Sequence, residues 1–235
     1  MLTWIVLTGE YPPDCGGVGD YTARLGAALA SCGDRVLVCV PARRDGGTLD
    51  RITGVDVLEL PDRFGPRARE VLARTLDAGA ARLLVQYVPN AFGVRGTNLS
   101  WCRWLLQRAR EQRDDVRVMF HEPYFYFEWN RPDRAVLAVS QRTMAVMLLR
   151  AASHVYMSTR SWERYLRPYA SSRFTPVTLP IPATLPDASA DPAVPAARGA
   201  WLDGRASTLV GHFGTYGSHV APALRWLLPR LLRAH

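Results

Sequence analysis

The stretch that decides the fold is Gly9-Glu10-Tyr11-Pro12-Pro13-Asp14-Cys15-Gly16-Gly17-Val18-Gly19-Asp20-Tyr21, which follows an apolar run and opens a stretch with helical spacing. Glycine has no Cβ, so backbone amides in such a loop can approach a ligand closely, and the N-terminus of the following helix favours an anion. The connection from Gly9 to Gly19 spans 11 residues, whereas plain strand-to-helix loops usually have about two to six. We therefore expect an anion-binding loop, with a plain connection as the alternative.

On both sides of this stretch, short apolar runs alternate with amphipathic stretches of helical length, which is typical of a parallel sheet with crossover helices. The runs are continuously apolar, as expected where helices cover both sheet faces. The fold class is thus α/β. We expect strands at Leu2–Thr8, Arg35–Pro41, Val55–Leu60, Arg82–Tyr87, Val116–His121, His154–Ser158 and Phe174–Leu179. We expect helices at Asp20–Cys32, which Gly33 would end, and at Pro66–Ala78, Leu99–Arg113, Arg131–Ala152 and Thr159–Pro168.

Proline changes the pattern after Leu179. Five prolines between Pro180 and Pro195 punctuate an Ala/Asp-rich stretch that runs to about Arg205, and we expect neither helix nor central strand there. Beyond it we expect a strand at Thr208–Phe213, a loop, and an amphipathic helix ending at His235. The predicted organisation is an α/β domain over residues 1–180, a linker over 181–206, and the first strand and helix of a truncated second α/β domain over 207–235.

Charge in this 235-residue chain is regional: the net charge is +8, and all 29 cations are arginine. Residues 1–128 carry 16 arginines and 16 acids, whereas residues 129–235 carry 13 arginines and 5 acids. The arginines are spaced singly among apolar residues, which favours a solvated or anion-facing surface and no nucleic acid partner. The four cysteines have no zinc-site spacing, so we expect buried free thiols. No stretch has the length of a membrane span, so we expect a soluble cytoplasmic protein able to contact the inner face of the membrane.

A dinucleotide site is a weaker interpretation of the glycine loop. Gly17-x-Gly19-x-x-Thr22 approximates the G-x-G-x-x-G fingerprint, but the turn is not tight. The second strand is followed by Pro41-Ala42-Arg43-Arg44 in place of an acidic residue. An arginine pair can accommodate a 2′-phosphate, so an NADP-dependent oxidoreductase stays open as an alternative.

Several short motifs occur in an order similar to that of one known family. Glu10-Tyr11-Pro12-Pro13 and Gly16-Gly17-Val18-Gly19 come first, and further motifs follow later strands. These are Gln86-Tyr87-Val88-Pro89 with Phe92-Gly93, His121-Glu122-Pro123, Ser158-Thr159, Pro180-Ile181-Pro182 and Gly211-His212-Phe213-Gly214-Thr215-Tyr216-Gly217. In this order the chain resembles the N-terminal domain of GT-B fold glycosyltransferases of the retaining family 4 type, followed by the start of the C-terminal domain.

The resemblance implies two Rossmann-like domains that face a cleft, with a nucleotide-sugar donor held mainly by the second domain and the acceptor mainly by the first. It implies no cofactor and no metal, since backbone amides can stabilise the departing diphosphate. His121 is then the catalytic candidate, with a buried structural histidine as the alternative. The acceptor-binding candidates are Tyr87, Glu122 and Tyr124. The candidates for the donor's diphosphate and sugar are Gly16, Gly17, Val18, Gly19, Gly214 and Thr215.

An aromatic run, Tyr124-Phe125-Tyr126-Phe127-Glu128-Trp129, follows the histidine motif. Aromatic faces can stack on sugars or line a lipid-facing groove, and packing in a core is the alternative. The family's late pair of glutamates, seven residues apart, has no counterpart before His235. We therefore expect a retaining glycosyltransferase in an incomplete version, acting on a lipid, glycan or small molecule. A non-catalytic module that binds an acceptor or a partner protein is the alternative from another class.

Overall fold

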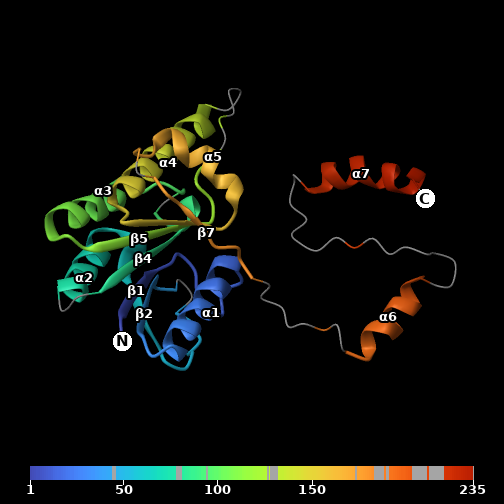
Figure 1. Ribbon diagram of the computed structural model, residues 1–235, viewed down its shortest axis with the longest axis horizontal. Coiled ribbons are helices and arrows are strands. Elements are labelled where there is room, and N and C mark those ends of the chain that lie inside the picture. Colours follow the sequence, from blue (N-terminus) through green and yellow to red (C-terminus); the bar gives the residue numbers. More distant parts are fainter. Residues whose placement is uncertain are drawn as a thin grey trace. The chain divides into compact units, whose positions relative to one another are not determined.

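The computed structural model in Figure 1 divides into two compact units, Met1–Thr184 and Leu185–His235. The structure describes residues 1–43, 46–77, 81–93, 95–125, 127, 132–172, 174–182, 188, 191–202, 211 and 220–234.

The first unit is built on a parallel sheet of seven strands. The strands are β1 (Thr3–Leu7), β2 (Arg35–Pro41), β3 (Val55–Leu60), β4 (Arg82–Tyr87), β5 (Asp115–Phe120), β6 (His154–Met157) and β7 (Val177–Thr178). Their order is β3-β2-β1-β4-β5-β6-β7, and every neighbouring pair is parallel. The first six strands follow the order of the Rossmann fold, in which the connections reverse direction between β1 and β4. The α/β class expected from the sequence is thus confirmed.

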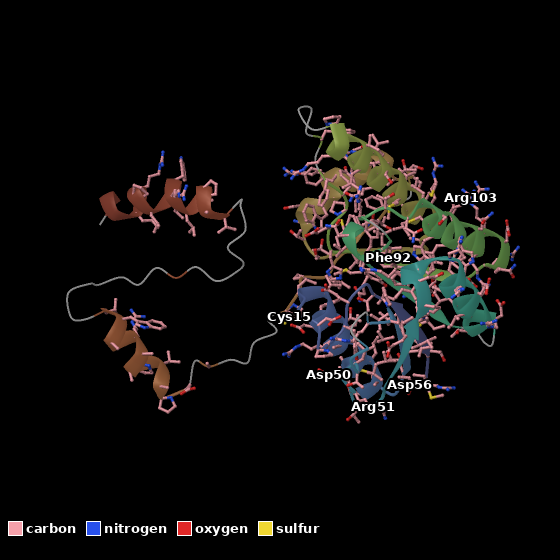
Figure 2. All side chains as sticks on the ribbon, turned by 180° about the vertical axis from the view of Figure 1, so that it is seen from behind. Cys15, Asp50, Arg51, Asp56, Phe92 and Arg103 are labelled. Atoms are coloured by element: carbon pink, nitrogen blue, oxygen red, sulfur yellow. The ribbon has the colours of Figure 1, made fainter. Side chains whose placement is uncertain are left out.

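Helices cover both faces of this sheet, as Figure 1 shows for α1 on one side and α3 and α4 on the other. The helices of the first unit are α1 (Gly17–Ser31), α2 (Pro66–Asp77), α3 (Leu99–Gln107), α4 (Pro132–Ala151) and α5 (Glu163–Leu166). One core joins the sheet to the helices α2 to α5, and it includes Leu72, Trp101 and Leu148. The other core lies under α1 and includes Tyr21. In Figure 2, Phe92 lies inside this unit whereas Arg103 and Cys15 lie at its surface.

Most predicted boundaries are confirmed to within one or two residues, and the exceptions have local causes. Helix α3 ends at Gln107 and continues as a single π-turn, Arg108–Gln112. The helix expected at Thr159–Pro168 is divided into α5 and two flanking 3₁₀ turns, Arg160–Trp162 and Arg167–Tyr169. Strand β7 has only two residues because Pro176 and Pro180, which lack an N–H, lie on either side.

Gly33 ends α1 as predicted. Its φ of 87° is left-handed, its N–H donates to Ala30 O, and the N–H of Asp34 donates to Leu29 O. These two bonds form a Schellman motif, which satisfies carbonyls that the helix end would leave free.

The second unit contains α6 (Ala193–Leu202) and α7 (Val220–Ala234). The expectation that the proline-rich stretch holds no helix is wrong for α6. Pro195 is the third residue of α6, where a backbone N–H has no partner within the helix, and the Asp191 carboxylate accepts from Ala193 N at 2.8 Å. The helix expected near the C-terminus is confirmed as α7, whereas the strand expected at Thr208–Phe213 lies outside the described residues, Gly211 excepted.

Large apolar side chains of the second unit are exposed. Trp201 of α6 is 70% exposed and Trp226 of α7 is 60% exposed. None of the residues that the structure describes in this unit is buried. Within the described parts of both units, no helix has the length and apolarity needed to cross a membrane.

The expectation of buried thiols is right for two of the four cysteines. Cys39 and Cys102 are buried, and burial raises the pKa of the Cys39 thiol to about 12 and raises the pKa of Cys102 as well. Cys15 and Cys32 are exposed, because one lies in the loop before α1 and the other directly follows its last turn. All four are free thiols.

Candidate functional site

A cavity of about 580 Å³ lies at the carboxyl ends of the strands in the first unit. Its walls come from the segments that follow β1, β3, β4, β5 and β6, and they include Gly9, Arg63, Asn90, His121 and Ser158. Open parallel sheets bind ligands outside the carboxyl ends of their strands, where the strand order reverses. The cavity spans β1 and β4, the two strands between which that reversal occurs.

Glu10 caps the helix that follows the glycine loop. Its Oε1 accepts from Val18 N at 2.9 Å and from Gly19 N at 3.0 Å. This cap explains why α1 begins at Gly17 and not at Asp20, since a carboxylate eight residues before Val18 in sequence satisfies the first turn. Two amides that an anionic ligand could meet at this helix end already donate to a carboxylate of the chain itself.

The glycines of the loop occupy different environments. A Cβ on Gly16 would lie 2.2 Å from Glu10 Oε1, so glycine there makes room for the cap. Gly17 faces open space, because no heavy atom lies within 4 Å of the position that a Cβ would take, and both glycines line the cavity together with Val18. Gly19 is buried behind them against the backbone of Glu10 and Tyr11.

His121 follows β5 and lines the cavity, although its side chain is only 9% exposed. Its Nε2 lies 2.7 Å from Gln86 Oε1, and its ring packs edge-on against Tyr21 at 5.3 Å. A carbonyl oxygen only accepts, so Nε2 carries the proton and Nδ1 keeps a lone pair. Burial lowers the pKa of His121 from 6.5 to about 4, so the imidazole is neutral near pH 7.

The backbone of His121 is held by the end of β4 and by the segment that follows β6. Its N–H donates to Tyr87 O at 3.0 Å. Its carbonyl accepts from Trp162 Nε1 at 2.7 Å and from Ser158 Oγ at 3.2 Å. The histidine therefore has little freedom to move, which suits a group that must meet a ligand in one geometry.

The three acceptor-binding candidates lie in different places. Tyr87 is 1% exposed and packs in the core against Phe92 and Phe120, which favours a structural role over contact with an acceptor. Glu122 lines the large cavity and also a second one of about 240 Å³. Tyr124 lines the second cavity, and its hydroxyl donates to Tyr165 O at 2.6 Å.

The aromatic run is held by an arginine of α4. The guanidinium of Arg142 lies 4.2 Å from the ring centre of Tyr124 and 4.1 Å from that of Phe127. Tyr124 is partly buried against the main core, as the alternative interpretation expects, whereas Phe125 and Phe127 are exposed. Tyr126, Glu128 and Trp129 lie outside the described residues, as do the donor candidates Gly214 and Thr215.

Two residues of the site were not selected from the sequence. Gln86 is fully buried, and its Oε1 faces Nε2 of His121, so it determines which ring nitrogen carries the proton. A glutamine at the end of an apolar strand was the available signal. Arg63 lines the cavity from the turn after β3, and nothing in its local sequence separates it from the other arginines.

One arginine of the pair Arg43-Arg44, on which the NADP alternative rests, is bound to a carboxylate of the chain. Arg43 forms an ion pair with Asp14, a residue of the glycine loop. Its neighbour Arg44 lies outside the described residues. Arg43 is therefore tied to a carboxylate and does not stand ready for a 2′-phosphate.

Similarity to other proteins is confined to the structure. No model of a protein family matches the sequence, and no curated protein sequence is similar to it. Among solved structures, the chain is similar to Os79 from O. sativa in complex with UDP, with 14% identity, a TM-score of 0.46, and coverage of 91% of this chain and 60% of Os79. It is also similar to a variant of Os79 with two alanine substitutions in complex with UDP, with 13% identity, a TM-score of 0.46, and coverage of 95% of this chain and 57% of that one. The chain spans less than two thirds of the length of these two structures.

Proposed function

We propose that this chain takes part in sugar transfer from a nucleotide-diphosphate sugar and supplies the acceptor-side domain of a GT-B glycosyltransferase. One observation carries the proposal. The glycine loop and His121, which come from distant motifs in the order of that family, line a single cavity at the point where the strand order reverses. We further propose that residues 207–235 begin the donor-binding domain.

The residues of the cavity suit a hydroxyl-rich ligand. A neutral His121, protonated at Nε2, offers Nδ1 as an acceptor for a ligand hydroxyl. A pKa of about 4 makes this imidazole a poor proton carrier near pH 7, so its role is to orient a hydroxyl. The open space at Gly17 lets a sugar approach the backbone.

The finer features rest on the motif resemblance. Retention of configuration, transfer without a metal, and a lipid, glycan or small-molecule acceptor belong to this proposal on that ground. The excess of arginine after residue 128 suits an anionic acceptor or an anionic membrane surface.

The test is binding of UDP-, GDP- and ADP-sugars to the full chain, measured by saturation-transfer NMR. We expect at least one to receive signal at its hexose protons. Gly17→Val should weaken this binding by roughly tenfold or more, because the new side chain enters the cavity.

Gly199→Val in α6 is the matched control. Gly199 also faces open space and lies outside the cavity lining, so this variant should bind like the wild type. Equal binding by the Gly17 variant would contradict the site. Stabilisation by NADP with no response to nucleotide sugars would contradict the function.

A further inference from the structure

The turn that brings Arg63 to the cavity has a strained backbone. Asp62, Arg63 and Phe64 have φ values of 50°, 44° and 66°. For residues other than glycine the left-handed conformation is unfavourable, because Cβ comes close to the backbone carbonyl oxygen. Three such residues in succession persist only where the surrounding structure holds them.

Two anchors hold this turn, one on each side of Arg63. The Asp62 carboxylate accepts from Gly65 N at 3.1 Å, Arg67 N at 2.9 Å and Ala68 N at 3.0 Å, and so caps α2. Phe64 is fully buried, with its ring centre 4.6 Å from that of Phe92. The backbone between these anchors carries Arg63 to the cavity wall.

Arg63 has no carboxylate partner among the described residues. Its Nε is buried and makes no hydrogen bond within that part of the chain. Arg108 provides the contrast, since its guanidinium is paired with Asp77 at 2.8 Å and with Asp114 at 2.6 Å. Arg63 is therefore held at the cavity by a strained backbone, and its guanidinium can donate hydrogen bonds to a ligand.

Arg63 brings a charged donor to a cavity whose lining also holds the carboxylates of Glu10 and Glu122 and the neutral side chains of Asn90 and Ser158. Of the described residues that line the cavity, Arg63 alone carries a positive charge, because His121 is neutral near pH 7. The amides of Val18 and Gly19 already donate to Glu10. The planar guanidinium matches phosphate and carboxylate groups with paired hydrogen bonds.

We propose that Arg63 binds an anionic group, a phosphate or a carboxylate, on the acceptor that enters this cavity. The assignment to an acceptor rests on the proposed function, whereas the anion site itself does not. A nucleoside diphosphate offers the same chemistry as a phosphorylated acceptor, so the experiment separates the two.

The experiment compares binding of glucose 6-phosphate, glucose and UDP to the full chain by calorimetry. The variant is Arg63→Asn, since asparagine tolerates a left-handed backbone. We expect its affinity for glucose 6-phosphate to fall roughly tenfold to hundredfold, with binding of glucose unchanged. Arg67→Asn, at an exposed arginine four residues on, should bind like the wild type.

Stability is a second readout. Arg63→Asn should unfold at the same temperature as the wild type or higher, because it relieves strain, whereas a structural arginine would lower that temperature when removed. Should the asparagine variant not fold, Arg63→Gly repeats the measurement with the residue that adopts positive φ most easily.

Each outcome decides between ligands. If the Arg63 variant loses affinity for glucose 6-phosphate and keeps its affinity for UDP, the result supports an anionic acceptor. An equal loss of affinity for UDP would show that Arg63 binds the donor's phosphates, which overturns the acceptor assignment. Wild-type affinity of both Arg63 variants for the phosphates, or no phosphate binding by the wild type, overturns the anion site. Arg63-dependent binding of glucose 6-phosphate without any binding of nucleotide sugars leaves the anion site standing and refutes the proposed sugar transfer.

Discussion

At the scale of single residues, His121 shows how burial sets chemistry. The side chain faces the cavity, but desolvation penalises its charged form and Gln86 occupies Nε2. A histidine in such surroundings accepts a hydrogen bond through Nδ1 and does not carry charge near neutral pH.

This environment predicts a dependence of stability on pH. The folded-state pKa of His121 is about 4 and its ordinary value is 6.5, so between these values the unfolded chain binds a proton that the folded chain does not. The free energy of unfolding should therefore fall by roughly 3 kcal/mol as the pH drops from about 6.5 to about 4. Urea denaturation at a series of pH values measures this contribution.

His121→Gln should flatten the dependence in that pH window, because glutamine does not titrate. His154→Gln, at an exposed histidine that begins β6, should leave it in place. If the free energy of unfolding of the His121 variant depends on pH as that of the wild type does, groups other than His121 cause the dependence.

Residue by residue, the sequence predicted the strand-end positions of the site and missed those set by tertiary contacts. His121 could be placed because it follows an apolar strand, where polar side chains of α/β proteins reach ligands. Tyr87 also lies at the end of an apolar strand, yet it is buried. Side chains of a strand alternate between the two faces of the sheet, and Tyr87 lies on the face that packs against Phe92 and Phe120. Arg63 depends on three consecutive left-handed residues, for which Asp-Arg-Phe gives no local signal.

At the scale of elements, strands were predicted more accurately than helix ends. The central strands are apolar throughout, so their limits coincide with the first polar or turn-forming residues. The start of α1 depends on Glu10, which lies eight residues before Val18. Helix α6 begins where Asp191 satisfies its first turn, and proline is tolerated there.

The start of α1 yields a prediction with a closely matched control. Gly16→Ala would place its Cβ 2.2 Å from Glu10 Oε1 and displace the carboxylate from the cap. We expect a loss of roughly 1 kcal/mol in the free energy of unfolding, the usual value of an N-cap interaction. Gly17→Ala, at the next residue with open space around it, should be neutral or slightly stabilising in the same denaturation experiment. Equal effects of the two variants would contradict the role of Glu10.

At the scale of the whole molecule, the buried cores belong to one unit. Both hydrophobic clusters lie between Trp4 and Leu166, and the residues described beyond Thr184 include no buried side chain. The parallel sheet and its helices thus have their own hydrophobic core, as a domain that folds independently does.

We therefore expect a chain that ends at Thr184 to fold by itself. Its free energy of unfolding, measured in urea by circular dichroism, should lie within about 1 kcal/mol of that of residues 1–235, because the described part of the removed segment has no fully buried side chain. The NMR spectrum of the shorter chain provides the control for native packing. Aggregation or loss of the cooperative transition on truncation would contradict the expectation.

The exposed indole rings of α6 and α7 give this protein built-in optical probes. Trp201 and Trp226 emit from a water-like environment, whereas Trp101 of α3 is 1% exposed and emits from an apolar one. Arg230 stacks on Trp226 at 3.8 Å, so the ring has a charged neighbour on its own helix. Any surface that closes over α7 shifts the emission of Trp226 to the blue and protects it from acrylamide, and Trp226→Phe isolates that contribution from those of the other six tryptophans. Fluorescence quenching thus detects a partner of the second unit without a label.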